Sequence, residues 1–235
     1  MFEPARRVVF RDQAAGALTH AILTGRLQPG QAITERQLAH DLQISRAPIR
    51  EALRELEKAG LIVTRPHKGT YVASFNDEDV EEIYSLRATL ELMAIRRAVE
   101  RATKADIESL ENEIEEMQRY SDRDFNATIA IDLAFHRRIV EIAAHRRLLD
   151  AWDLLANQLR ALYTITDVPN LIRSLYGYVE DMPDRHRPIV DHIRNRDVSR
   201  ASDYIYEHIT DVADTIVRQR AQAAAATQPP GTTDQ

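Results

Sequence analysis

Cysteine is absent from the 235-residue sequence, which excludes disulfide bonds, thiolate catalysis and cysteine-type zinc sites. A metal ion could therefore be bound only by nitrogen and oxygen ligands. Apolar runs of the roughly 18 residues needed to cross a bilayer are also absent. The first residues, Met1 to Arg7, lack the apolar core of a signal peptide. We therefore predict a cytoplasmic protein with no membrane partner.

Glycine is scarce, with 7 in the chain, and apolar residues after residue 77 recur with the 3.6-residue period of amphipathic helices. Hydrophobic residues make up 44% of the chain and charged residues 29%, which is ordinary for a globular protein. A chain of this length can hold two domains, each with its own core. The sequence predicts a mainly α protein whose C-terminal part is an antiparallel bundle of six or seven helices.

Residues 45 to 56 have the features of a DNA recognition helix. Ser45 is a favourable N-cap, and Pro48 lies in the first turn, where a missing N–H is tolerated. One apolar stripe is spaced for burial and consists of Ile49, Ala52, Leu53 and Leu56. An adjacent face carries Arg46, Arg50 and Arg54. One face is expected to pack against the domain, and the other to meet DNA.

The flanking segments complete a winged helix-turn-helix. Residues 35 to 42 predict a short helix, and Gln43 and Ile44 form a tight turn before the recognition helix. After Gly60, residues 61 to 64 are rich in β-forming side chains, and residues 65 to 70 form a basic turn. These segments predict a two-stranded wing with a basic tip.

The motifs of this region resemble the winged-helix domain of the GntR family of bacterial transcription regulators. They are Gly25-Arg26-Leu27-Gln28-Pro29-Gly30, Ser45-Arg46-Ala47-Pro48-Ile49-Arg50-Glu51-Ala52-Leu53 and Gly60-Leu61. The resemblance spans about residues 12 to 73. It implies that the partner is double-stranded operator DNA, contacted through Arg36, Arg46 and Arg50. The predicted DNA-binding set is completed by Ser45, Ala47, Pro48, His67, Lys68 and Gly69.

Physical chemistry agrees with the contacts that the resemblance implies. A guanidinium can pair bidentately with guanine in the major groove, and Ser45 at a helix N-terminus suits a phosphate. The alternative is that Arg50 and Arg54 pair on a solvated face with the neighbouring acids Glu51, Glu55 or Glu57.

Charge is divided between the two parts of the chain. Residues 1–75 hold 11 lysines and arginines against 7 acidic residues, whereas residues 76–235 hold 20 against 30. An acidic surface repels DNA, so we expect the DNA contacts to be confined to the basic N-terminal part and to weaken with salt.

The predicted organisation is a DNA-binding domain over residues 1–75, a helical domain over 76–222 and a disordered tail over 223–235. Asn76 or Asp77 is expected to cap the first helix of the second domain. The inward side chains of that helix are predicted to be Val80, Ile83, Leu86, Leu90, Ala94 and Ala98. Further helices are expected at about 104–121, 125–145, 147–165, 169–179, 184–195 and 198–222.

Four ionisable side chains lie on the apolar faces of these helices. Asp132 and His136 lie one turn apart in the middle of the apolar face of the 125–145 helix, and His186 and His208 lie on the apolar faces of two later helices. A buried charge without a partner is costly, and a divalent metal would satisfy all four side chains. Nitrogen and oxygen ligands favour Zn²⁺, with Ni²⁺ or Mn²⁺ as alternatives.

The same four residues resemble the metal-binding FCD effector domain of the FadR-like branch of the GntR family. Members of that branch carry an Asp-x-x-x-His pair, matched here by Asp132 to His136, and two later histidines, matched by His186 and His208. The resemblance covers about residues 78 to 220. It implies a domain that senses a small effector and forms dimers.

Arg87 is the first candidate for effector binding, because it lies on the inward stripe of its helix and a guanidinium can hold a carboxylate bidentately. The resemblance also implies an effector-facing arginine on this helix. The alternative for Arg87 is an intrahelical pair with Glu91. Arg160, one turn before Tyr163, is the second candidate, and Trp152 is assigned to the core.

These observations predict a ligand-responsive transcription regulator, specifically a repressor, with no catalytic residues. A homodimer is expected because one recognition helix reads few base pairs and two-fold symmetry matches a palindromic operator. The expected effector is a small organic acid or sugar acid that coordinates the metal. Two alternatives stay open: a constitutive DNA-binding regulator with a purely structural metal, and a metal-dependent hydrolase, for which the sequence offers no general base beside the ligands.

Overall fold

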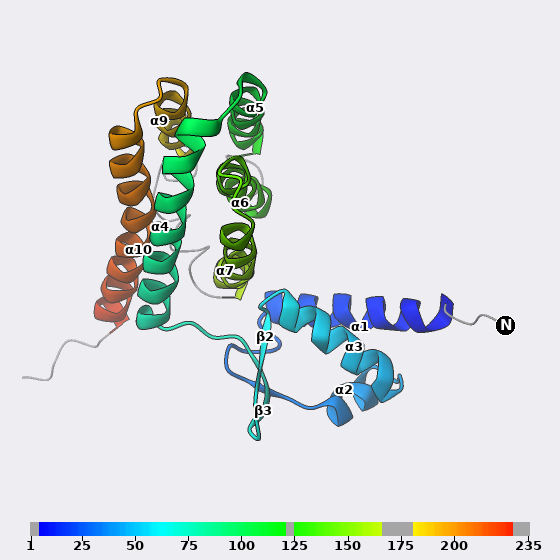
Figure 1. Cartoon of the computed structure of the whole chain (residues 1–235). Helices are drawn as coiled ribbons and strands as arrows, with labels where there is room; N and C mark the ends of the chain where they lie inside the picture. The colour runs from blue at the N-terminus through cyan, green and yellow to red at the C-terminus, as the bar shows by residue number, and fades with distance from the viewer. Residues whose placement is uncertain (1–4, 121–124, 166–180, 228–235) are drawn as a thin grey trace, which may run out of the picture. The chain divides into compact units, whose positions relative to one another are not determined.

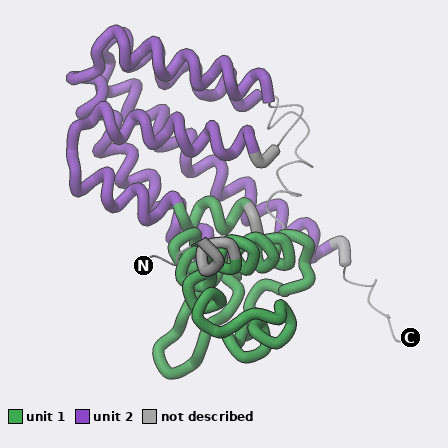
Figure 2. Tube along the Cα trace, turned by 90° about the vertical axis from the view of Figure 1, so that its right-hand side faces the viewer, with its two compact units in different colours: residues 1–75, 157–167 green, residues 76–156, 168–235 purple. Residues whose placement is uncertain are grey.

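The computed structural model describes residues 5–120, 125–165 and 181–227, and most of them lie in helices (Figure 1). The chain divides into two compact units. Unit 1 comprises residues 1–75 and 157–167, and unit 2 comprises residues 76–156 and 168–235 (Figure 2). The predicted fold class is confirmed, with a winged helix-turn-helix followed by a helical domain. Within the described residues, no helix is both long enough and apolar enough to span a membrane.

Up to residue 75, the described residues of unit 1 form three helices and a small antiparallel sheet. The elements up to residue 75 are α1 (Ala5–Leu23), β1 (Ala32–Ile33), α2 (Glu35–Asp41), α3 (Arg46–Lys58), β2 (Ile62–Arg65) and β3 (Gly69–Val72). The strand order is β1-β3-β2, and Ala32 pairs with Tyr71. The predicted two-stranded wing is present as the β2–β3 hairpin, and β1, which the sequence did not predict, adds a third strand to the sheet. A strand of two residues is too short to show the alternation by which strands are detected.

The recognition helix α3 begins and packs as the sequence predicts. Ser45 occupies the N-cap with extended backbone, although its side chain makes no capping hydrogen bond. The apolar stripe is buried, with Ile49 and Ala52 fully covered. It joins a core that includes Leu18, Ile62 and Val72. Burying each large aliphatic side chain contributes about 1.5–3 kcal/mol, so this stripe fixes α3 and leaves the arginine face outward.

The C-terminal part of α7 (Arg146–Ile165) groups with unit 1, a segment that the sequence analysis assigned to the second domain. Ala161 belongs to the same core as α3. Gly60, which follows α3, has φ +74°, and a Cβ built there would lie 2.6 Å from the carbonyl oxygen of Asn157. Only glycine fits at this position, because any side chain would meet both backbone strain and a clash.

Unit 2 consists of packed helices. The elements are α4 (Asp77–Arg101), α5 (Lys104–Tyr120), α6 (Phe125–Ile142), the N-terminal part of α7, α9 (Met182–Arg194) and α10 (Val198–Thr227). α4 and α10 lie side by side (Figure 1). Asp77, at the start of α4, pairs with Arg220 near the end of α10, and Arg96 donates to Ser202 near the start of α10. These two helices are therefore antiparallel.

The start of α4 agrees with its prediction, whereas one of its side chains and the end of α10 do not. Asn76 caps α4 through a capping box with Asp79, as expected. Leu86, however, is 49% exposed rather than inward, because the buried stripe of α4 runs through Tyr84, Arg87 and Glu91. The tail was predicted to begin at residue 223, but α10 continues to Thr227, which agrees with the high helix propensity of the alanine run there. The helix predicted at 169–179 lies outside the described residues.

Candidate metal centre and DNA-binding face

The four predicted metal ligands come together in the interior of unit 2. Asp132 and His136 project from adjacent turns of α6, His186 from α9 and His208 from α10. Their exposed fractions are 6%, 0%, 1% and 8%, respectively. One potential ligand atom from each side chain lies within 4.8 Å of all the others.

The distances between the donor atoms suit a common metal ion. Asp132 Oδ1 lies 3.0 Å from His186 Nε2 and 3.7 Å from His136 Nε2. The two Nε2 atoms are 3.2 Å apart. Ligands at about 2.0–2.2 Å from a zinc ion stand roughly 3–4 Å from one another, so the cluster needs little rearrangement to close around an ion.

Hydrogen bonds on the far side of two of the three rings indicate which nitrogen faces the cluster. His186 Nδ1 is 2.7 Å from the carbonyl oxygen of Met182, which can only accept, so Nδ1 carries a proton and Nε2 is the atom that faces the other candidate ligands. His136 Nδ1 is likewise 2.5 Å from Glu91 Oε2. Nδ1 of His208 is buried and has no hydrogen-bond partner among the described residues. A metal ion would provide the partner that a buried nitrogen of this kind requires.

The protonation states also fit a cation. Burial lowers the pKa of His136 and lowers that of His208 well below its usual value, so a metal ion competes with a weakened proton affinity at both rings. Burial alone would raise the pKa of Asp132, but His136, His186 and Arg87 outweigh it and hold the pKa below its usual range. Glu91 is ionised as well, with its pKa lowered to about 2 by His136 and Arg87 despite burial. Two carboxylates face one guanidinium, so the cluster can accept a positive ion.

The face of α3 that carries the arginines is open to solvent. Arg36, on α2, and Ser45, Arg46, Ala47 and Arg50 are all exposed. Pro48 is buried, so the structure favours a role for it in starting α3 rather than in contacting DNA.

Arg50 is paired, but not with the neighbours that the sequence suggested. Its Nε and Nη2 donate to Glu35 Oε1 and Oε2, both at 2.8 Å, which links α3 to the first residue of α2. This hydrogen-bonded pair lowers the pKa of Glu35. It is a surface pair, because the side chain of Arg50 is 56% exposed.

The wing presents its basic tip on a tight turn. His67 has φ +60° and Gly69 has φ +109°, and both are exposed, as is Lys68. The hydroxyl of Tyr71 donates to the carbonyl oxygen of Lys68 at 2.7 Å, and the Arg65 guanidinium lies 5.6 Å from the centre of the Tyr71 ring. These contacts hold the tip of the hairpin in one conformation.

Comparison with known families assigns both parts of the chain. Residues 10–72 match the family described as bacterial regulatory proteins, gntR family, and residues 82–211 match the FCD domain. The chain belongs to the GntR family and carries an FCD domain. It is therefore a bacterial transcription regulator and not an enzyme, as predicted.

Individual relatives of this FCD-domain regulator extend over most of its length. A probable D-xylose utilization operon transcriptional repressor of Paenarthrobacter nicotinovorans is 28% identical and covers 94% of this chain and 95% of its own. The HTH-type regulator YdhC of Bacillus subtilis is 28% identical over 81% of this chain and 84% of its own. A solved structure of Lar, described as controlling the Listeria monocytogenes agr system, is 17% identical in sequence, with a TM-score of 0.69. The match covers 93% of this chain and 99% of that chain, and it shows a likeness of fold alone.

The two predicted effector-binding arginines of the regulator differ in location. Arg87 is 2% exposed, and its Nε donates to Glu91 Oε1 at 2.7 Å, so the intrahelical pair considered from the sequence is present. Arg87 Nη2 also lies 3.7 Å from Asp132 Oδ2, which places the guanidinium beside the candidate metal ligands. Arg160 is exposed and donates to Asn157 Oδ1 at 3.2 Å, so it lies outside the buried cluster.

Glu91 is the residue of this site that sequence reasoning missed. From the sequence, no helical glutamate was expected near the ligands, but Glu91 contacts His136 directly. The available signal was its position four residues after Arg87 on the buried stripe of α4. Glu91 is not available as a general base beside a metal, because its oxygens contact Arg87, His136 and the indole N–H of Trp152, at 3.4 Å.

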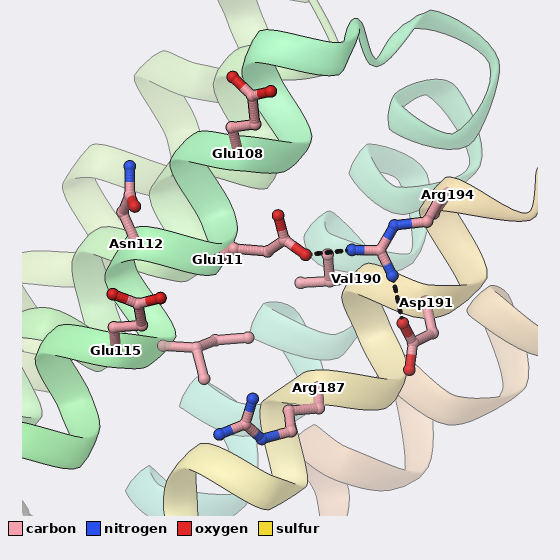
Figure 3. Close-up of a pocket in the computed structure, with 9 residues that line it drawn as sticks. Glu108, Glu111, Asn112, Glu115, Arg187, Val190, Asp191 and Arg194 are labelled. Carbon is pink, nitrogen blue, oxygen red and sulfur yellow. Dashed lines mark hydrogen bonds and ion pairs between the residues drawn. The ribbon is translucent and has the colours of Figure 1, made fainter.

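A groove of about 440 Å³ lies between α5 and α9 on the surface of the regulator (Figure 3). Glu111 faces Arg194 across this groove, and Arg194 also donates to Asp191. Arg187 pairs with Asp184 and Gln118. The lining of the groove holds no histidine, so the groove is a weaker candidate for a metal-bound acid than the buried cluster.

Proposed function

We propose that this regulator is a repressor that binds a palindromic operator as a homodimer and is controlled by a small carboxylate or sugar acid sensed at a Zn²⁺ site. The observation that carries the proposal is the buried set of Asp132, His136, His186 and His208 next to the Arg87 guanidinium. Three imidazole nitrogens and one carboxylate oxygen favour zinc, with Ni²⁺ or Mn²⁺ as alternatives.

Charge balance supports an anionic effector. Histidines bind a metal ion as neutral imidazoles, so with a divalent ion bound the charges of Asp132, Glu91 and Arg87 leave the cluster with one positive charge. A monocarboxylate bound at an open metal position would neutralise the buried cluster, whereas a neutral ligand would leave its charge uncompensated. Arg87, beside Asp132, is positioned to contribute to the recognition of such an acid.

DNA binding is proposed to use Arg36, Arg46 and Arg50 in the major groove and the wing residues His67, Lys68 and Gly69 at the backbone or minor groove. The exposure of all six supports this assignment. Ser45 and Ala47, exposed at the start of α3, are proposed to lie near phosphate. One recognition helix covers few base pairs, so two copies on a palindrome supply the affinity that one lacks.

Repression is the direction of control that the name of one relative favours. The Paenarthrobacter nicotinovorans relative carries the name of a repressor of a sugar-utilization operon. In that type of control the acid must bind more tightly to the DNA-free arrangement of the protein, because a ligand with equal affinity for both arrangements shifts nothing.

The experiment is a DNA-binding titration with an operator selected from random DNA by the wild-type protein. Fluorescence anisotropy would be measured with zinc-loaded protein, with and without a panel of mono- and dicarboxylates and sugar acids. We expect one class of acid to weaken operator binding by at least fivefold, and His208→Ala to remove the response while leaving operator binding intact. A response that persists unchanged in His208→Ala would overturn the metal-site proposal.

A second candidate is a constitutive regulator whose metal is purely structural. The specific observation in its favour is that Arg87 is already engaged by Glu91 and lies beside Asp132. In the same titration this candidate predicts that no acid changes operator affinity, and that chelation lowers the melting temperature.

A further inference from the structure

Glu91 is a fully buried carboxylate with 0% exposure, at the centre of the α4 stripe. Its Oε1 accepts hydrogen bonds from Arg87 Nε at 2.7 Å and from Trp152 Nε1 at 3.4 Å. Its Oε2 lies 2.5 Å from His136 Nδ1. Glu91 therefore contacts a candidate metal ligand, the candidate effector arginine and the tryptophan of α7 at the same time.

An ionised carboxylate can only accept hydrogen bonds, so its contact with His136 requires the proton to be on Nδ1. The other nitrogen, Nε2, then carries no proton and lies 3.7 Å from Asp132 Oδ1 and 3.2 Å from His186 Nε2, on the side where the ion would bind. A carboxylate behind a ligating histidine fixes the ring orientation and increases the basicity of the ligand.

The second imidazole of the cluster provides an internal contrast. His186 Nδ1 faces the backbone carbonyl of Met182, a neutral acceptor that no side-chain substitution removes. His136 depends instead on the side chain of Glu91. A substitution at Glu91 should therefore disturb the orientation of His136 and leave the orientation of His186 unchanged.

We propose that Glu91 is a positioning residue that holds His136 in its metal-binding tautomer and ties it to Arg87, so that the metal and the effector arginine are oriented by one carboxylate. The proposal rests on the zinc site of the proposed function. It assigns Glu91 no contact with the metal or with the acid.

The test compares Glu91→Gln with Glu81→Gln, the same chemical change at an exposed position of the same helix. Metal affinity of the full-length protein would be measured by competition with a chelating dye, and ligand geometry by the visible absorption of bound Co²⁺. We expect Glu91→Gln to weaken metal binding about 10- to 100-fold and to alter the Co²⁺ spectrum. Glu81→Gln should behave as wild type. Wild-type affinity and an unchanged spectrum in Glu91→Gln would overturn the proposal.

A second measurement needs no variant. Nitrogen-15 NMR of the histidine rings in the wild-type protein reports which nitrogen of His136 is protonated. Protonation at Nδ1 is expected, and a proton on Nε2 would refute the role of Glu91. Failure of the wild-type protein to take up any metal would instead refute the zinc site, and the tautomer in the metal-free protein would still decide the role of Glu91.

Discussion

At the level of single residues, Arg50→Ala should weaken operator binding without lowering the stability of the protein. A bidentate contact between arginine and guanine contributes about 1–3 kcal/mol, and a dimer would lose two of them in Arg50→Ala. We therefore expect the operator dissociation constant to rise by about 30-fold or more. The melting temperature should hardly change, because a pair in which Arg50 is 56% exposed contributes little to stability. Anisotropy titration and thermal melting measure both quantities.

Glu35→Gln is the matched control, since it weakens the ion pair and keeps the arginine. Operator binding close to wild type in Glu35→Gln would show that Arg50 acts on DNA and not through the pair. An Arg50→Ala protein that binds the operator with wild-type affinity would contradict the assignment.

Helical spacing was enough to predict that four ionisable side chains of unit 2 point inward, because a polar residue on the apolar face of a helix is carried into the core. The same reasoning placed Arg87 in the interior, where it is 2% exposed. It did not identify Glu91 as a partner of His136, because these residues are 45 positions apart and come from different helices. Spacing along one helix contains no information about which residues of another helix face it.

At the scale of elements, the contact between α5 and α6 contains a carboxyl that should destabilise the protein at neutral pH. Glu113 is partly buried, its Oε2 has no hydrogen-bond partner within the described residues, and burial raises its pKa to about 7. Glu141 raises this pKa further, while Arg138 opposes the shift. The folded protein thus holds this proton more tightly than the unfolded chain, so its free energy of unfolding falls as pH rises from about 4.5 to about 7.

Glu113→Gln keeps the neutral form and should remove this fall. We expect the variant to be about 1–2 kcal/mol more stable than wild type at pH 8, a value reduced for the partial exposure of the group, and close to wild type at pH 4.5. Urea unfolding at the two pH values measures the difference, with the exposed Glu115→Gln as a control on the same helix. Equal pH dependence in wild type and Glu113→Gln would disprove the prediction.

Element boundaries were predicted well where capping and periodicity were strong, and less well elsewhere. α5 and α7 begin and end within one residue of their predicted limits. α10 runs beyond its predicted end because alanine favours helix even without buried contacts. β1 was missed because its two residues are defined by pairing with β3, an interaction that is not visible in the local sequence.

At the scale of the whole molecule, the division of charge and the proposed two-fold symmetry predict how the regulator meets DNA. Light scattering should give a mass of about twice the 26.8 kDa of one chain. A full palindrome should bind much more tightly than a half-site, and affinity should fall steeply with salt because the basic residues of the N-terminal part neutralise phosphates. A monomer in solution that binds half-sites and palindromes equally would contradict this prediction.

The most direct test of the central claim is a thermal-melt screen of the full-length protein against carboxylates and sugar acids, run with zinc and again after chelation. A ligand at one hundred times its dissociation constant stabilises the folded state by about 2.7 kcal/mol, which is readily measured. We expect one class of acid to raise the melting temperature only in the zinc-loaded protein, and not in His208→Ala. An equal rise after chelation, or no rise with any acid while the zinc stays bound, would contradict sensing through Asp132, His136, His186 and His208.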